Sequence, residues 1–114
     1  MLPRGQRIAR DFFPRHTEPS VSWNGAVLRA RLYRSPAAIA PPRFSVVVAK
    51  KYAKTAVARN RFKRQTYACI AQELKGLGML RFSRIVIFPK QPLDQIPLTT
   101  LLLDITSLIA RARL

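Results

Sequence analysis

The residues best suited to chemistry lie in one short stretch, 50–64, which reads KKYAKTAVARNRFKR. Its charged and amide side chains are Lys50, Lys51, Lys54, Arg59, Asn60, Arg61, Lys63 and Arg64. Ammonium and guanidinium groups bind phosphate, and an amide can donate and accept hydrogen bonds with a sugar, a base or a phosphate. Almost no acid lies nearby to pair with these cations, which makes an ordinary solvated charge run the weaker interpretation. The stretch therefore predicts a surface that binds nucleic acid.

Residues for catalysis by protein side chains are few. His16 is the only histidine and Cys69 the only cysteine, so no cluster of His and Cys can bind a metal ion. The acids are scattered along the chain, and no glycine-rich phosphate loop precedes a helix. Cys69 falls on the apolar side of a predicted helix, where a thiol usually packs as a small apolar group. We therefore expect no catalytic residue in this chain, no cofactor bound by its side chains alone, and chemistry that belongs to a partner.

The charge balance favours a polyanionic partner. Among 114 residues, 21 Lys and Arg stand against 5 Asp and Glu, for a formal net charge of +16. Nucleic acid fits such a chain best and an anionic membrane second. No apolar run reaches the ~20 residues of a membrane span, and the opening residues, MLPRGQRIARDFF, carry no apolar signal-peptide core. The length of 114 residues predicts one domain over residues 1–114. A single cysteine forms no internal disulfide, and with no export signal we expect the chain in the cytoplasm.

A strand and a helix must position the basic stretch. Residues 44–49, FSVVVA, are apolar and β-branched on both faces, as in an interior strand. Thr55 suits the N-cap of a helix that continues to about residue 74, with Gly76 as its stop signal. At ~100° per residue, one side of this helix gathers Ala58, Phe62, Thr66 and Cys69. Most of the cations, with Asn60, lie on an adjoining arc, and Arg61 falls on the far side.

The remaining segments complete a small sheet with helices packed on it. A short amphipathic helix is predicted over 6–13, ended by a proline. A short strand near residues 20–22 and an alternating strand over 26–34 follow. Residues 84–88, RIVIF, predict another buried strand. From residue 97 onward an i, i+3, i+4, i+7 repeat predicts an amphipathic helix, with Pro97 in its first turn. The expected order is helix, three strands, basic helix, strand, helix.

Two features leave alternatives open. On the strand over 26–34, one face carries Leu28, Ala30 and Leu32, and the other carries Val27, Arg29, Arg31 and Tyr33. The second face is either an ordinary exposed surface or the floor of a cationic groove. Near the N-terminus, Phe12 and Phe13 either pack in the core or stack on nucleic-acid bases.

The segment 43–64, RFSVVVAKKYAKTAVARNRFKR, resembles the signature of the bacterial ribonuclease P protein subunit. That signature is an Arg before an apolar strand, then Lys-Lys, a spacer with Ala-Val, and Arg-Asn-Arg-x-Lys-Arg. The matching positions are Arg43, Lys50, Lys51, Ala56, Val57, Arg59, Asn60, Arg61, Lys63 and Arg64. The basic N-terminal segment, the strand pair, RIVIFPK and the final helix follow the family order more loosely.

The resemblance implies an α+β fold: a four-stranded mixed sheet with three helices, in the order α-β-β-β-α-β-α, and a left-handed β-α-β crossover through the basic helix. It also implies a subunit of an endoribonuclease holoenzyme, in which a catalytic RNA with Mg²⁺ removes the 5′ leader of precursor tRNA. The expected partners are that RNA and precursor tRNA, with no membrane and no obligate protein partner.

The resemblance further assigns roles to residues. The basic stretch would meet RNA, and a leader groove would use Phe12, Val27 and Arg29. The family usually carries an aromatic one turn after the position of Phe12, where this chain has His16 beyond Pro14. The first helix should therefore be short, with leader contacts shifted to Phe13 or His16.

Two other classes of protein compete with this interpretation. A ribosomal or general RNA-binding protein would use the same charge without supporting cleavage. A peripheral membrane protein could use the C-terminal amphipathic helix, but that helix has Arg111 and Arg113 only at its tip and few cations along its polar side, which argues against it.

Overall fold

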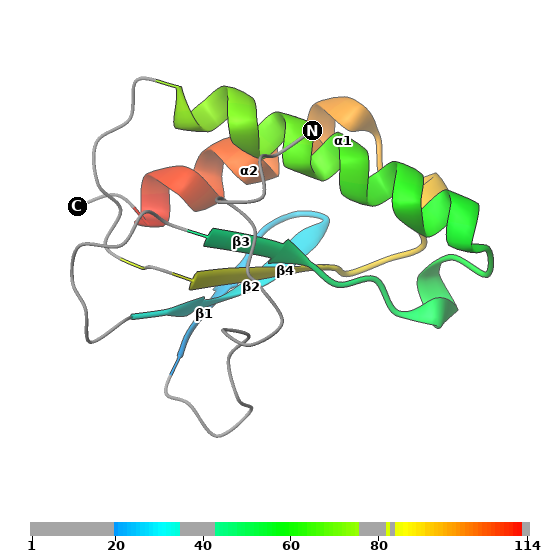
Figure 1. Ribbon diagram of the computed structural model, residues 1–114, viewed down its shortest axis with the longest axis horizontal. Coiled ribbons are helices and arrows are strands. Elements are labelled where there is room, and N and C mark those ends of the chain that lie inside the picture. The colour runs from blue at the N-terminus through cyan, green and yellow to red at the C-terminus, as the bar shows by residue number, and fades with distance from the viewer. Residues whose placement is uncertain (1–19, 35–42, 76–81, 83, 113–114) are drawn as a thin grey trace.

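The computed structural model describes residues 20–34, 43–75, 82 and 84–112. In these residues four strands, two α-helices and two short 3-10 turns follow one another (Figure 1). The elements are β1 (Val21–Asn24), β2 (Leu28–Tyr33), β3 (Arg43–Val46), η3 (Lys50–Tyr52), α1 (Ala56–Leu74), β4 (Arg84–Pro89), η4 (Leu93–Gln95) and α2 (Leu98–Ala112).

The strands form one mixed sheet in the order β1-β2-β4-β3. β2 pairs antiparallel with both β1 and β4, whereas β3 and β4 run parallel. Both α-helices cover the same face of the sheet (Figure 1). The α+β class and the four-stranded mixed sheet are thus confirmed. The predicted helix over 6–13 lies outside the described residues, so two α-helices are described instead of three.

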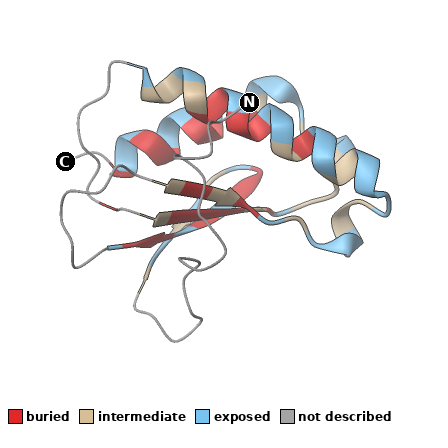
Figure 2. Ribbon diagram, in the orientation of Figure 1, coloured by how far each residue is buried: buried red, intermediate tan, exposed pale blue. Residues whose placement is uncertain are grey.

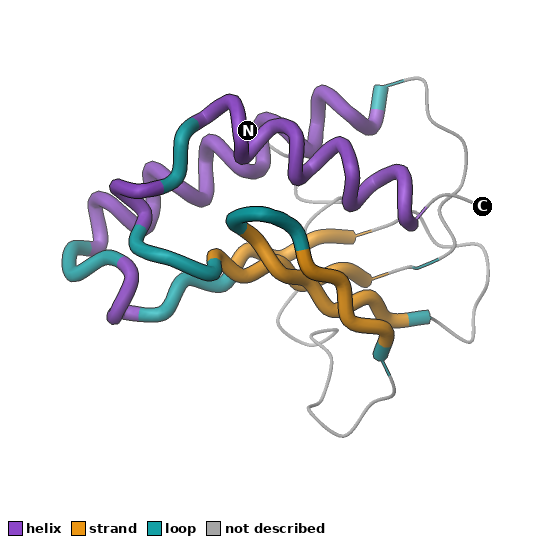
Figure 3. Tube along the Cα trace, turned by 180° about the vertical axis from the view of Figure 1, so that it is seen from behind, coloured by secondary structure: helices purple, strands orange, loops and turns teal. Residues whose placement is uncertain are grey.

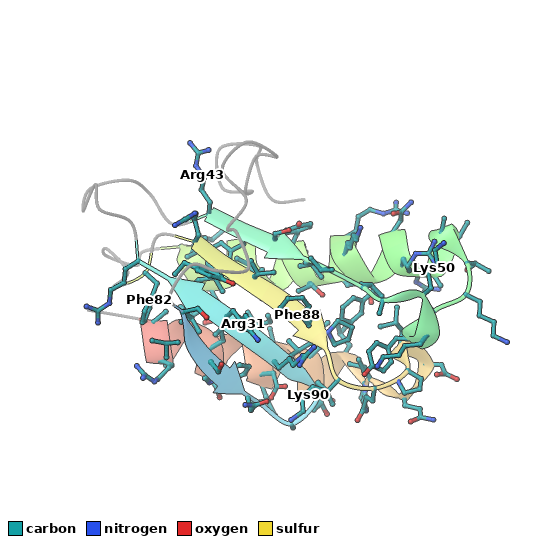
Figure 4. The ribbon with its side chains drawn as sticks, turned by 90° about the horizontal axis from the view of Figure 1, so that it is seen from below. Arg31, Arg43, Lys50, Phe82, Phe88 and Lys90 are labelled. Atoms are coloured by element: carbon teal, nitrogen blue, oxygen red, sulfur yellow. The ribbon has the colours of Figure 1, made fainter. Side chains whose placement is uncertain are left out.

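The connection between the parallel strands is unusual. α1 links β3 to β4, which are neighbours in the sheet. Figure 4 views the sheet from the face opposite the helices, with α1 passing behind it; when the strands are turned to point upward, β4 lies to the right of β3. The crossover is therefore left-handed, against the strong general preference for right-handed connections, and agrees with the expectation.

The core lies between the sheet and the helix layer. β2 alternates as predicted, with Leu28, Ala30 and Leu32 buried between exposed arginines. Figure 2 shows the buried segments where the helices face the sheet. From α2 the core takes the repeat that the sequence predicts: Leu101, Ile105, Leu108, Ile109 and Ala112. Burial of these apolar faces, at about 25 cal/mol per Å², is the main force that holds the two layers together.

One charged residue is buried where the sequence pattern suggests apolar packing. Asp104 of α2 is only 6% exposed, and its carboxylate accepts hydrogen bonds from three successive backbone amides. The donors are the N–H groups of Ala26 at 3.0 Å, Val27 at 2.8 Å and Leu28 at 3.0 Å, in the turn between β1 and β2. A carboxylate with several backbone donors is well satisfied even when buried. Asp104 therefore ties α2 to the β1–β2 hairpin.

The hairpin turn is shaped to let this carboxylate approach. A Cβ added at Gly25 would lie 2.5 Å from a ring carbon of Trp23 and 2.6 Å from Asp104 Oδ2, so no side chain fits there. On its other side, Lys90 Nζ donates to the Gly25 carbonyl at 2.9 Å, and the Lys90 amide donates to the Val27 carbonyl at 2.9 Å. The turn is thus held by Lys90, directly after β4, and by Asp104 of α2, both far away in sequence.

The ends of two strands differ from the predictions. The strand predicted over 44–49 ends at Val46, because after one more pairing, from the Val47 amide to the Ile87 carbonyl, the chain leaves β4 and forms η3 at Lys50. The strand near residues 20–22 extends to Asn24. The basic helix and the C-terminal helix are confirmed, with α1 ending at Leu74.

We expect Asp104→Asn to destabilise the protein by about 3 kcal/mol, because the amide loses the charge and aims one N–H₂ group at backbone donors. The urea midpoint should fall by about 1–3 M in equilibrium unfolding followed by circular dichroism. Asp94→Asn is the matched control, since it makes the same change at an exposed acid. Equal midpoints for the two variants would contradict this role of Asp104.

Candidate nucleic-acid interface

The basic residues gather where β3 gives way to α1. Lys50 and Lys51 lie in η3, Lys54 follows, and all three are exposed. Thr55 is the N-cap of α1, and its Oγ1 accepts from the Ala58 amide at 3.2 Å, as its position predicts. Free amides and the helix dipole make this end of α1 attractive to anions, and the three lysines add formal charge to it. Figure 4 shows Lys50 beside the start of α1.

The first three turns of α1 carry the other five residues that the sequence predicts to bind RNA. Asn60, Arg61 and Arg64 are exposed, and Arg59 and Lys63 are half-buried. The opposite side of the helix packs into the core through Phe62, Thr66, Tyr67, Cys69 and Ile70. We use the name basic surface for Lys50, Lys51, Lys54, Arg59, Asn60, Arg61, Lys63 and Arg64.

Arg59 has a structural contact that sequence reasoning missed. Its Nη1 donates to the Ala53 carbonyl at 2.8 Å, which links α1 to the segment that follows η3. The contact holds the backbone just before Lys54 against α1, and the guanidinium keeps further N–H donors. No sequence signal distinguishes this arginine from the others in the stretch.

Arg61 points away from Arg59 and Lys63 on α1. It lines a hollow with Leu93 of η4 and Leu98 of α2, on the side of α1 opposite to the contact made by Arg59. The Arg-Asn-Arg segment thus presents its two guanidinium groups on two sides of one helix, as expected for residues two apart.

Tyr67 fixes α1 relative to the sheet. Its hydroxyl oxygen accepts from the Val46 amide at 3.1 Å, at the last residue of β3. Helical periodicity puts Tyr67 next to the arc of the cations, but the side chain is buried by this contact. The bond holds α1 against the end of β3 from which the basic surface begins.

The face of the sheet opposite the helices is also cationic. Arg29 and Arg31 of β2 are exposed there, and the strand register aligns Tyr33 with Arg84 of β4, and Arg84 with Arg43 of β3. Arg29 stacks over the Phe88 ring at 5.2 Å and Arg84 over the Tyr33 ring at 5.8 Å. Figure 4 shows Arg31 and Phe88 on this side. We call Arg29, Arg31, Tyr33, Arg43, Arg84 and Phe88 the open face.

Two residues that the alternation over 26–34 predicts to be exposed, Val27 and Tyr33, are buried. Val27, expected beside Arg29 in a groove, is only 5% exposed and belongs to the core, because it lies in the hairpin turn held by Asp104 and not in the pleat of β2. Tyr33 is on the expected face but is buried. Of the other predicted groove residues, Phe12 and Phe13, together with the neighbouring His16, lie outside the described residues.

Two further titratable residues near the core, Cys69 and Glu73, have structural roles. Cys69 is buried as predicted; burial raises the pKa of its thiol, and the nearby Glu73 carboxylate adds to the shift. Such a thiol stays protonated and is a poor nucleophile at neutral pH. Glu73 accepts from Thr106 Oγ1 at 2.9 Å, which joins the two helices. None of the described helices is long and apolar enough to cross a membrane.

The fold and this site define a class of protein: a small basic α+β domain in which a left-handed crossover helix begins with a cluster of exposed cations. The family model for ribonuclease P matches residues 10–113, and the chain therefore belongs to the ribonuclease P protein family, as a subunit of the bacterial type. This membership makes it part of an endoribonuclease holoenzyme that has an RNA partner. No curated protein matches the chain in a sequence comparison.

Solved structures agree on the fold. The RNase P protein from Thermotoga maritima superposes with a TM-score of 0.67 at 18% identity, over 81% of this chain and 83% of that chain. A Staphylococcus aureus RNase P protein mutant with defective mRNA degradation activity gives 0.63 at 19% identity, over 81% and 75%. The RNase P protein from the same species gives 0.57 at 16% identity, over 82% and 83%.

We expect Arg59→Ala to lower the free energy of unfolding by about 1 kcal/mol, because it removes the hydrogen bond to the Ala53 carbonyl. Lys63→Ala, a neighbouring half-buried cation on the same helix, should stay within about 0.5 kcal/mol of the parent. Equilibrium urea unfolding of both variants measures the difference. If the two variants unfold alike, the Arg59 contact contributes nothing to stability.

Proposed function

We propose that this chain supports ribonuclease P by binding RNA with two surfaces. The basic surface binds the catalytic RNA, and the open face binds the 5′ leader of precursor tRNA. The observation that carries the proposal is the gathering of exposed cations at η3 and the start of α1, with Lys50, Lys51 and Lys54 beside the helix N-terminus. Such a cluster attracts the phosphates of RNA.

The positions of the acids support this assignment. The described residues contain three acids, and two of them accept hydrogen bonds within the fold: Asp104 from the hairpin and Glu73 from α2. Only Asp94, which lines a hollow with Lys51 and Lys54, lies beside the basic surface. The cations are therefore available to an external anion.

The open face combines cations with aromatic rings, the composition of a surface that binds single-stranded RNA. Guanidinium groups contact phosphates, and an aromatic ring such as Phe88 accepts the face of a base with little regard to sequence. Arg29 stacks over one face of that ring, and a base would stack on the guanidinium plane above it. A leader held there is present in the precursor and absent from the product, which raises the affinity for precursor relative to mature tRNA.

Hydrolysis falls to the RNA partner in this proposal, with Mg²⁺ bound through RNA. Among the described residues no three His, Cys, Asp or Glu side chains lie together as a metal site. The protein's part is to bind and orient the two RNA molecules, as one domain over residues 1–114 in the cytoplasm, without an obligate protein partner. A general or ribosomal RNA-binding role would use the same basic surface, but the family match favours ribonuclease P.

Reconstitution tests the subunit assignment. We expect the parent protein to raise cleavage of precursor tRNA by its cognate catalytic RNA at low Mg²⁺, because neutralised phosphates reduce the demand for metal ions. The triple variant Lys50→Ala, Lys63→Ala and Arg64→Ala should lose most of this enhancement. Its binding to the RNA should depend less on salt, with a slope of log K against log salt reduced by about 2–3.

The control removes cations from elsewhere on the surface. Lys75 and Arg111 are exposed and lie at the far ends of α1 and α2. The double variant Lys75→Ala and Arg111→Ala should enhance cleavage almost as the parent does. RNA binding without any enhancement by the parent protein would instead indicate a general RNA-binding role.

The leader assignment predicts a selective loss. We expect Arg29→Ala with Arg31→Ala to weaken holoenzyme binding of precursor tRNA by about tenfold, or about 1.4 kcal/mol. Binding of mature tRNA, which has no leader, should not change. Arg34→Ala, an exposed cation just beyond β2, serves as the control in the same equilibrium binding assay. An equal loss for precursor and mature tRNA would contradict a role in leader binding.

A further inference from the structure

An open hollow lies between the starts of the two helices, and three cations of the basic surface line it. Figure 3 shows that η3, η4 and the first turns of α1 and α2 gather toward one end of the molecule. Two adjoining spaces occur there, of about 410 and 330 Å³, and both are lined by Ala58, Leu93 and Asp94. We call the two spaces together the slot.

The floor of the slot is apolar. Phe62, Ile96 and Leu101 line the larger space, and Tyr52 lines the smaller one. At the rim, Val57 is 75% exposed and Leu98 58% exposed, although both are large apolar residues. These side chains contribute little to the core, and their exposure is unfavourable unless a partner covers them.

The charges around the slot favour RNA as that partner. Lys51 and Lys54 line the smaller space, and Arg61 lines the larger one. An RNA backbone that follows these three cations must pass over the apolar floor between them. An unstacked base can leave the strand at that point and enter, because every base has an apolar face and polar edges.

Asp94 has no evident purpose in a surface that binds only phosphate. It is exposed, it faces both spaces from η4, and among the described residues no hydrogen bond or ion pair engages its carboxylate. Beside Lys51 and Lys54 a carboxylate repels phosphate. A carboxylate can, however, accept a hydrogen bond from the amino group of adenine, guanine or cytosine.

We propose that the slot binds the base of one unpaired nucleotide of the catalytic RNA, an inference that rests on the proposed RNA binding of the basic surface. The base packs against Tyr52 and Leu93, and its amino group donates to Asp94. Lys51 and Lys54 hold the phosphates beside it, and Arg61 holds the strand at the other end. The slot thus selects an extruded base with an exocyclic amino group, whereas the cations of the basic surface contact the backbone.

Chemical probing of the assembled complex tests the proposal. The parent protein should protect the Watson–Crick edge of one or two unpaired nucleotides from dimethyl sulfate or kethoxal, within a wider backbone footprint measured with hydroxyl radicals. Ala58→Phe fills both spaces without changing the charge. It should restore the base reactivity and leave the backbone footprint in place. Ala68→Phe is the matched control, at an exposed alanine of the same helix that does not line the slot.

A second variant, Asp94→Ala, changes the affinity for the catalytic RNA in opposite directions under the two explanations of Asp94. If Asp94 accepts from a base, Asp94→Ala should weaken binding of the catalytic RNA about five- to tenfold, because the amino group loses its acceptor. If Asp94 only repels phosphate, the same variant binds more tightly. Tighter binding by Asp94→Ala would therefore overturn the proposal, and this variant remains informative if Ala58→Phe fails to fold.

The other outcomes separate the slot from the basic surface. Identical base protection for the parent and Ala58→Phe, with an intact backbone footprint, overturns the slot but not RNA binding. A parent protein that self-associates in sedimentation, when Ala58→Phe does not and base reactivity is unchanged, assigns the slot to a protein contact and overturns it as well. If the parent gives no backbone footprint, the proposed RNA binding itself has failed.

Discussion

The contact on which the arrangement depends is the buried carboxylate of Asp104 against three backbone amides of the β1–β2 turn. Three amides in one tight turn cannot all find partners within the sheet, and a carboxylate is the one side chain that can accept from all of them. Gly25 must lack a side chain for this approach to occur. α2 is thereby fixed on the sheet, and the position of α1 beside it follows from packing.

The second constraint acts at the other edge of the sheet. The Val46 amide, at the end of β3, donates to Tyr67, and Arg59 bonds to the carbonyl of Ala53. These contacts hold the two ends of the link between β3 and α1, so the cations of η3 and of the helix form one surface. The basic surface lies at η3 and the start of α1, whereas the open face lies on the side of the sheet opposite the helices (Figure 4), so each surface can meet a different part of an RNA partner.

Local patterns were enough to predict much of the fold and the basic surface. The alternation of β2, the apolar repeat of α2 and the cap at Thr55 are properties of adjacent residues, and all three are found as predicted. Errors occurred where distant segments meet. Val27 was assigned to an exposed face by alternation, yet the turn held by Asp104 buries it, and the third strand ended early because η3 begins at Lys50.

The sequence by itself determined which elements form and where positive charge concentrates, because helix periodicity, strand alternation and charge density are local quantities. Only the tertiary structure decided which cations act together. It separated Arg61 from Arg59, gave Arg59 a backbone partner, and brought Asp94 of η4 opposite Lys51 and Lys54. Such juxtapositions depend on the packing of elements far apart in the chain, which no local pattern encodes.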